Sequence, residues 1–109
     1  MGRTMTPEGE VKEKVKKLLH KYGVYYEMYV PSGYGKQSLD FVGCAFGTYL
    51  AIETKQAGKK LTPRQQKTAL DMRKAGGLVV EIIGLDSPNF EKLEQWLMTL
   101  QAMKNLQGL

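Results

Sequence analysis

The chain has 109 residues, 42% of them hydrophobic, and its 16 basic and 11 acidic side chains give a formal net charge of +5. This length predicts one domain, residues 1–109, with a modest core that a dimer would help to stabilise. No apolar run is long enough to span a bilayer, and the charge favours a polyanion such as nucleic acid as the partner.

The cytoplasm is the expected compartment. Charged residues scattered through the first 21 positions exclude the apolar segment of a signal peptide. Cys44 is the single cysteine, so an internal disulfide cannot form. We interpret Cys44 as a small core residue rather than a nucleophile, because His20 is the only histidine that could act as its base.

The first predicted helix begins at Thr6, which can cap it, and at Pro7, which suits the first helical position. Glu10 lies in its first turns, beside an apolar stripe, and is a candidate to lean toward a metal site. An ordinary first-turn acid, favoured by the helix dipole, is the alternative interpretation. The stripe recurs at helical spacing until Gly23 and consists of Val11, Val15, Leu18, Leu19 and Tyr22.

A strand is predicted over residues 25–30, which are rich in aromatic side chains and end at Pro31. Residues 31–38 have the composition of a loop and lead directly to Asp40. Because loops beside a rigid site often carry binding contacts, we expect Tyr34 and Lys36 to contact nucleic acid. A solvated loop without such contacts is the alternative.

Residues 40–55 are predicted to form two short strands joined by a tight turn at residues 46–48. The second strand begins with an apolar run suited to burial and ends with Glu53, Thr54 and Lys55. Residues two apart on a strand point to the same side, so Glu53 and Lys55 project together and Thr54 faces away. An antiparallel pair closed at this turn brings Asp40 roughly level with Glu53 and Lys55.

Two carboxylates and one ammonium group would then share a patch at the edge of the sheet. Neighbouring carboxylates raise each other's pKa unless a cation lies between them. A divalent metal ion with oxygen ligands is a suitable occupant. A surface ion pair between Glu53 and a lysine is the alternative, since such pairs are common.

A second helix is predicted to begin at Thr62 and Pro63, with Thr62 and Gln65 at the spacing of a capping box. Capping alone accounts for Gln65, but a helix that begins so soon after Lys55 also directs its first turn toward the same edge. Gln65 is therefore also a candidate to contact a metal ion or a phosphate. Basic residues that flank the acidic patch suit a phosphodiester substrate, and those after Lys55 are Lys59, Lys60, Arg64 and Lys67.

Two elements complete the chain. Residues 78–83 form a near-continuous apolar run, which is typical of a strand covered on both faces. A last helix is predicted over residues 88–106, with a stripe that we interpret as core packing, although a stripe of this length could also cover a partner subunit. The predicted order is α-β-β-β-α-β-α, an α/β fold.

This order, together with Asp40 and the later Glu53-Thr54-Lys55, resembles the restriction-endonuclease-like fold and its PD-(D/E)XK nuclease signature. The chain looks most like the virus-type replication-repair nuclease group, VRR-NUC. Glu10 falls where these nucleases often carry an acidic residue on the first helix, and Gln65 falls where they carry a functional glutamine. Leu39 replaces the usual proline before the aspartate. The resemblance implies a mixed central sheet flanked by helices.

The resemblance also implies a phosphodiester hydrolase that needs Mg²⁺ or Mn²⁺. Asp40, Glu53 and the backbone carbonyl of Thr54 would hold the ion, and Glu10 would bind a metal-bound water or a second ion. Lys55 would position or help to deprotonate the attacking water, and Gln65 would orient that water or a phosphate oxygen.

Isolated members of the VRR-NUC group look like Holliday-junction resolvases and act on branched or flap DNA. The resemblance therefore implies a structure-selective DNA endonuclease in a bacterial or phage-infected host cytoplasm. A symmetric homodimer would place two cuts on a four-way junction. One alternative is a non-catalytic, basic nucleic-acid-binding module in which Asp40 and Glu53 are structural. The other is a structural or toxin-antitoxin-like interaction protein that uses the last helix as its interface.

Overall fold

A computed structural model describes residues 5–30 and 38–108 of the chain. Its helices and strands follow one another in the predicted order, so the predicted α/β fold class is confirmed. The elements are α1 (Pro7–Lys21), β1 (Tyr25–Met28), β2 (Phe41–Ala45), β3 (Thr48–Lys55), α2 (Pro63–Lys74), β4 (Leu78–Ile83) and α3 (Asn89–Leu106).

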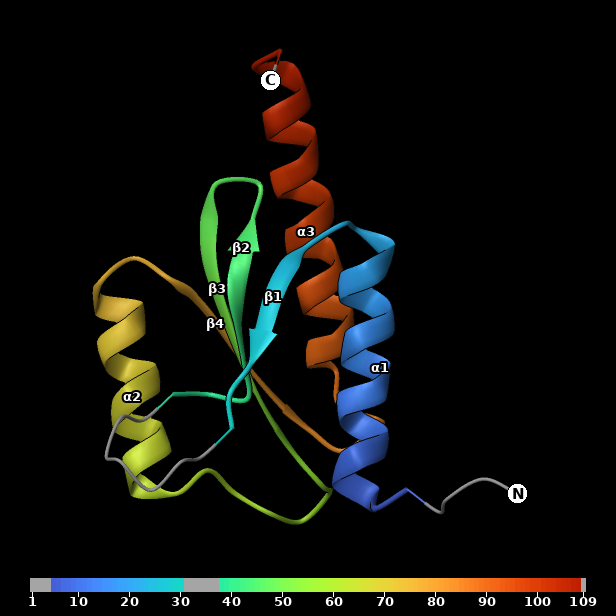
Figure 1. Cartoon of the computed structure of the whole chain (residues 1–109), viewed down its shortest axis with the longest axis vertical. Coiled ribbons are helices and arrows are strands. Elements are labelled where there is room, and N and C mark those ends of the chain that lie inside the picture. Colours follow the sequence, from blue (N-terminus) through green and yellow to red (C-terminus); the bar gives the residue numbers. More distant parts are fainter. Residues whose placement is uncertain (1–4, 31–37, 109) are drawn as a thin grey trace.

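The four strands form one mixed sheet in the order β1-β2-β3-β4. The first three strands pair antiparallel, and β3 pairs parallel with β4 after the chain crosses through α2. Helix α2 covers one face of the sheet, and α1 and α3 lie together on the other (Figure 1). Strand β3 is therefore covered on both faces, and five consecutive residues, Leu50 to Thr54, are buried.

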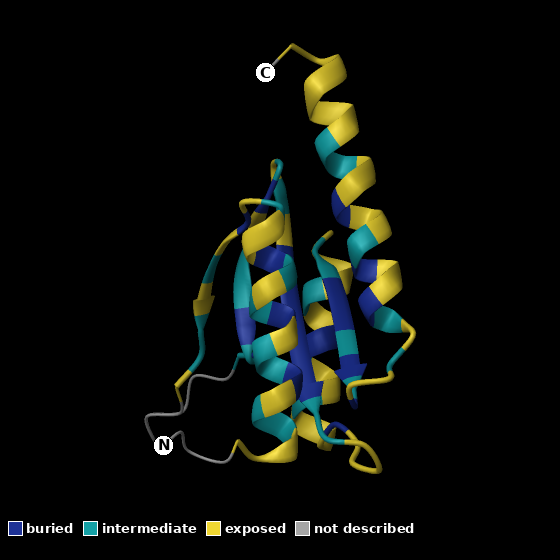
Figure 2. Cartoon of the chain, turned by 90° about the vertical axis from the view of Figure 1, so that its right-hand side faces the viewer, coloured by how far each residue is buried: buried dark blue, intermediate teal, exposed yellow. Residues whose placement is uncertain are grey.

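The core lies on both faces of the sheet. The larger cluster joins α1 and α3 to one face through residues such as Val15, Ile52 and Leu93, and the smaller cluster joins Ala51 to Ala69 of α2. Neighbouring residues of a strand point to opposite faces, which explains why Ala51 and Ile52 belong to different clusters. Figure 2 shows the buried residues concentrated in the strands and in the inner faces of the helices.

A two-residue turn sets the register of the hairpin formed by β2 and β3. Phe46 and Gly47 both adopt positive φ angles, 52° and 87°, in the left-handed region that such hairpin turns require. Phe41 consequently pairs with Ile52, and Asp40 and Glu53 are the residues that follow this last pair outward along the two chain segments. The turn thus decides which residues meet at the far end of the hairpin.

Three details differ from the sequence-based expectations. Strand β1 ends at Met28 rather than at residue 30. Cys44 is exposed and not a core residue, because it points to the opposite side of β2 from the buried Phe41 and Ala45. The stripe on α3 is only partly core: Phe90, Leu93 and Leu97 are buried, whereas the C-terminal part of the helix extends beyond the sheet and is largely exposed (Figures 1 and 2). Among the described residues, no helix is long and apolar enough to cross a membrane.

Candidate active site

Four of the predicted site residues meet at the end of the sheet where β3 finishes. The backbone amide of Asp40 donates a hydrogen bond of 3.0 Å to Oε1 of Glu53. The first turns of α1 and α2 flank this point, since Lys12 of α1 lies near Asp40 and Gln65 of α2 contacts Glu53. The structure therefore brings Asp40, Glu53, Lys55 and Gln65 into one cluster.

Asp40 lies in a bend immediately before β2, and two donors from Thr54 hold its carboxylate. Oδ2 of Asp40 accepts hydrogen bonds from the Thr54 amide at 3.0 Å and from the Thr54 hydroxyl at 2.6 Å. The resemblance implied only a backbone role for Thr54, and the strand pattern predicted that its side chain faces away from Glu53 and Lys55. The bend takes Asp40 out of the strand's alternation, so its carboxylate lies alongside β3 and reaches the Thr54 hydroxyl.

Glu53 is a buried carboxylate, with only 2% of the residue exposed. Its Oε2 accepts a hydrogen bond of 2.8 Å from Nε2 of Gln65 and lies 3.8 Å from Nζ of Lys55. Burial, and then the Asp40 charge, raise the pKa of Glu53 from 4.5 to about 7, against the opposing effects of the Asp40 amide and Lys55. Lys55 therefore lowers the pKa of Glu53 by less than burial and the Asp40 charge raise it.

Gln65 forms the predicted helix cap and also bonds to Glu53, while its predicted contact with a metal ion or a phosphate stays a prediction. Its side-chain Oε1 accepts a hydrogen bond of 2.9 Å from the backbone amide of Thr62, and the Thr62 hydroxyl accepts one from the backbone amide of Gln65. These bonds form the predicted capping box at the start of α2. The side-chain nitrogen, Nε2, donates to Glu53. The glutamine that caps the helix therefore also fixes the orientation of the buried carboxylate.

The two roles can be separated by substitution. Gln65→Glu retains an acceptor for the Thr62 amide but replaces the donor to Glu53 with a carboxylate, which repels Glu53. We expect α2 to remain intact while DNA cleavage falls about tenfold or more. Gln65→Ala removes both contacts, and we expect it also to lower stability by about 1 kcal/mol. Circular dichroism, thermal melts and cleavage rates measure these effects.

Gln66→Ala is the matched control for both variants, because this neighbouring amide bonds to the Leu61 carbonyl and not to Glu53. Cleavage by Gln65→Glu at the wild-type rate would show that Gln65 serves only as a helix cap.

Helix α1 approaches the site with Glu8 and Lys12 rather than with Glu10. Nζ of Lys12 lies 3.5 Å from Oε2 of Glu8 and 3.9 Å from Oδ1 of Asp40. The Glu8 charge also contributes to the raised pKa of Glu53. Glu10 is exposed, and residues two apart on a helix point about 200° apart, so Glu10 and Glu8 lie on opposite sides of α1.

The basic residues predicted to contact nucleic acid lie beside the site. Lys59 and Lys60 are exposed in the connection between β3 and α2, and Arg64 and Lys67 are exposed on the first turns of α2. Lys67 forms a 3.0 Å ion pair with Asp71. Tyr34 and Lys36 lie outside the described residues, so their predicted contacts stay predictions.

The donor set of this cluster suits a hard divalent cation. Within residues 5–30 and 38–108, no group of three or more histidine, cysteine, aspartate or glutamate side chains is gathered as a ready-made metal site. Asp40 and Glu53 nevertheless supply two carboxylates, and the Thr54 carbonyl lies between Glu53 and Lys55 in the chain. Oxygen donors of this kind favour Mg²⁺ or Mn²⁺. The Asp40 charge contributes, after burial, to the raised pKa of Glu53, and a cation between the two carboxylates would oppose that contribution.

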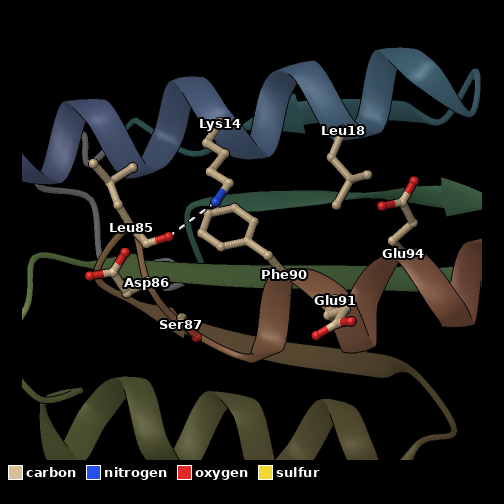
Figure 3. Close-up of a pocket in the computed structure, with 8 residues that line it drawn as sticks. All are labelled: Lys14, Leu18, Leu85, Asp86, Ser87, Phe90, Glu91 and Glu94. Atoms are coloured by element: carbon tan, nitrogen blue, oxygen red, sulfur yellow. Dashed lines mark hydrogen bonds between the residues drawn. The ribbon is translucent and has the colours of Figure 1, made fainter.

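A hollow of about 430 Å³ lies elsewhere, between α1 and the beginning of α3. Figure 3 shows the Lys14 side chain spanning it, with Nζ bonded to the Leu85 carbonyl at 3.1 Å and placed over the Phe90 ring. Acidic and apolar side chains share its walls, and none of them belongs to the Asp40–Glu53 cluster.

Comparison with known proteins supports the fold. No protein-family model matches the chain, and no curated protein matches it. Among solved structures, the catalytic domain of the homing endonuclease I-Bth0305I is similar, with a TM-score of 0.54 and 20% sequence identity over 93% of this chain and 98% of that chain. At this identity the likeness shows a shared fold, that of a nuclease catalytic domain, while the narrower resemblance to the VRR-NUC group stays a prediction.

Proposed function

We propose that this protein is a metal-dependent DNA endonuclease that hydrolyses phosphodiester bonds. The observation that carries this proposal is the hydrogen bond between Asp40 and the buried Glu53 at the end of β3. Gln65 donates a hydrogen bond to Glu53, and the Lys55 ammonium lies 3.8 Å from the same carboxylate. Exposed basic residues on the neighbouring loop and helix complement the phosphate backbone of DNA. The fold shared with a homing endonuclease catalytic domain is consistent with this chemistry.

Each side chain then has a distinct role. Asp40, Glu53 and the Thr54 carbonyl would hold Mg²⁺ or Mn²⁺, which would supply Lewis-acid polarisation of the scissile phosphate and lower the pKa of a bound water. Lys55 positions the attacking water and offsets the charge that develops on the phosphate oxygens. Gln65 fixes the direction of the Glu53 carboxylate through its 2.8 Å hydrogen bond. Glu8, rather than Glu10, is the acid on α1 that would bind a metal-bound water or a second ion.

We further propose that the substrate is branched DNA, such as a Holliday junction or a flap. The described part of the chain is a single sheet with three helices and has no separate element to read base sequence. A homodimer would present two such sites to a four-way junction. The exposed apolar residues on the overhanging part of α3, including Met98, Met103 and Leu106, are available to a second subunit, and light scattering measures whether the mass is twice 12.3 kDa.

The test is incubation of purified protein with labelled duplex, flap and four-way DNA in Mg²⁺, in Mn²⁺ and in chelator. We expect cleavage that requires the metal and is fastest on a branched substrate. Retention of DNA without cleavage in any metal would overturn the nuclease assignment and establish the non-catalytic binding module. Equal cleavage of all three substrates would support the nuclease assignment and overturn the proposed selectivity for branched DNA.

A further inference from the structure

Lys12 occupies an unusual position for a helix-surface lysine. It lies on the second turn of α1, with 31% of its side chain exposed, and its ammonium group stands between Glu8 and Asp40. The contact with Glu8 is an ordinary pair four residues apart on a helix. The contact with Asp40 is different, because it joins α1 to the cluster at the end of β3.

The two oxygens of Asp40 are not equivalent. Oδ2 is held by the amide and hydroxyl of Thr54 at 3.0 and 2.6 Å. Oδ1 faces Nζ of Lys12 at 3.9 Å. A cation that binds Asp40 without breaking the Thr54 contacts therefore has to use the oxygen beside the Lys12 ammonium.

We propose that Lys12 is a built-in counter-ion that a divalent metal must displace from Asp40 when it binds. The proposal rests on the metal site proposed above. In the metal-free protein, the ammonium group offsets the charges of Asp40 and Glu8, which otherwise add to the negative field around the buried Glu53. A divalent ion bound to Oδ1 of Asp40 would repel the Lys12 ammonium, which lies 3.9 Å from the same oxygen. The ammonium would therefore turn away from Oδ1.

The displaced ammonium remains attached to α1 beside the site, where a DNA phosphate is the available anion. Lys12 is thus a positioning residue with two opposite effects: it weakens metal binding to the free protein and strengthens DNA binding to the metal-loaded protein. A lysine that forms only a surface ion pair with Glu8 would produce neither effect, since such pairs contribute little.

Calorimetric titration with Mn²⁺ in the absence of DNA tests the first effect. We expect Lys12→Met to lower the dissociation constant for Mn²⁺ about tenfold, because the repelling charge is removed. Lys16→Met is the matched control: it removes the same charge one turn along α1, where the ammonium pairs with Glu13 at 2.9 Å. This control is expected to keep the wild-type affinity.

Two further measurements guard the interpretation. Thermal melts without metal should show Lys12→Met folded but less stable than wild type, with a larger rise in melting temperature on adding Mn²⁺. Binding of four-way DNA in Ca²⁺, which holds the metal site filled, should be several-fold weaker for Lys12→Met than for Lys16→Met.

The outcomes separate this proposal from the proposed function. If folded wild type and Lys12→Met bind Mn²⁺ with equal affinity, the displacement is overturned while the metal site stands. If neither protein binds Mn²⁺, the metal site itself fails, and the displacement fails with it. Tighter binding by Lys12→Met, or binding by Lys12→Met alone, supports the displacement.

Discussion

Lys55→Ala is expected to lower the rate of DNA cleavage by about a hundredfold to a thousandfold. This is the usual effect of removing one preorganised group that stabilises charge in the transition state of an enzyme. The Lys55 ammonium lies 3.8 Å from Oε2 of Glu53, with only 16% of its side chain exposed, so solvent and mobile ions cannot replace it efficiently. Lys55 does not serve as a ligand in the proposed site, so Mn²⁺ binding should persist. Single-turnover cleavage and Mn²⁺ calorimetry on the same preparation measure both effects.

Lys92→Ala provides the control for the loss of one positive charge. Lys92 is an exposed residue of α3 and belongs to none of the contacts at the end of β3. We expect it to cleave at the wild-type rate. If Lys55→Ala also cleaves near the wild-type rate, the role assigned to Lys55 is wrong.

Glu53 is expected to make the metal-free protein less stable as the pH rises. Its pKa is about 7 in the folded protein and 4.5 ordinarily, so between these values the folded state retains a proton that the unfolded state has released. The free energy of unfolding therefore decreases from about pH 4.5 to pH 7 and levels off above it. One pKa unit corresponds to about 1.4 kcal/mol, so the loss from this group is about 3 kcal/mol.

Comparison with Glu53→Gln isolates this contribution from those of other acids. Urea unfolding in chelator at pH 5 and pH 8 should show wild type losing about 3 kcal/mol more than Glu53→Gln over this range. Glu81→Gln changes the residue paired with Glu53 on β4 but keeps Glu53, so it is expected to follow wild type. Parallel profiles for wild type and Glu53→Gln would show that ionisation of the buried carboxylate does not destabilise the folded state by this amount. Divalent metal should restore stability to wild type at pH 8 and have little effect on Glu53→Gln.

The sequence predicted the order of the elements and the meeting of Asp40 with Glu53 for a local reason. The turn at Phe46 and Gly47 is short enough to fix the register, and register determines which residues lie opposite each other. The capping box of Thr62 and Gln65 was equally local, because its spacing alone predicts the start of α2. Only the structure shows that the same glutamine also reaches Glu53.

Glu8 could have been found from the sequence. It lies three residues before Val11 and seven before Val15, in line with the apolar stripe of α1 that packs on the sheet. The sequence-based prediction looked for an acid beside the apolar stripe of α1, which is Glu10, and not for an acid in line with the stripe, which is Glu8. The hydroxyl of Thr54 could not be found in this way, because it contacts Asp40 only through the bend before β2, which no residue pattern specifies.

The packing of α3 shows another limit of periodicity. Its apolar stripe continues at helical spacing along the whole helix, but the sheet covers only the part that contains Phe90, Leu93 and Leu97. Periodicity reports which side of a helix is apolar and not where the surface beneath it ends.

The central claim is that Asp40 and Glu53 bind a divalent ion, and paramagnetic resonance of Mn²⁺ titrated into the metal-free protein tests it most directly. Wild type is expected to remove the signal of free Mn²⁺ in proportion to the protein added, and Asp40→Asn, which keeps the shape of the side chain but not its charge, is expected to leave most of that signal in solution. Equal uptake of Mn²⁺ by folded wild type and Asp40→Asn would contradict the claim.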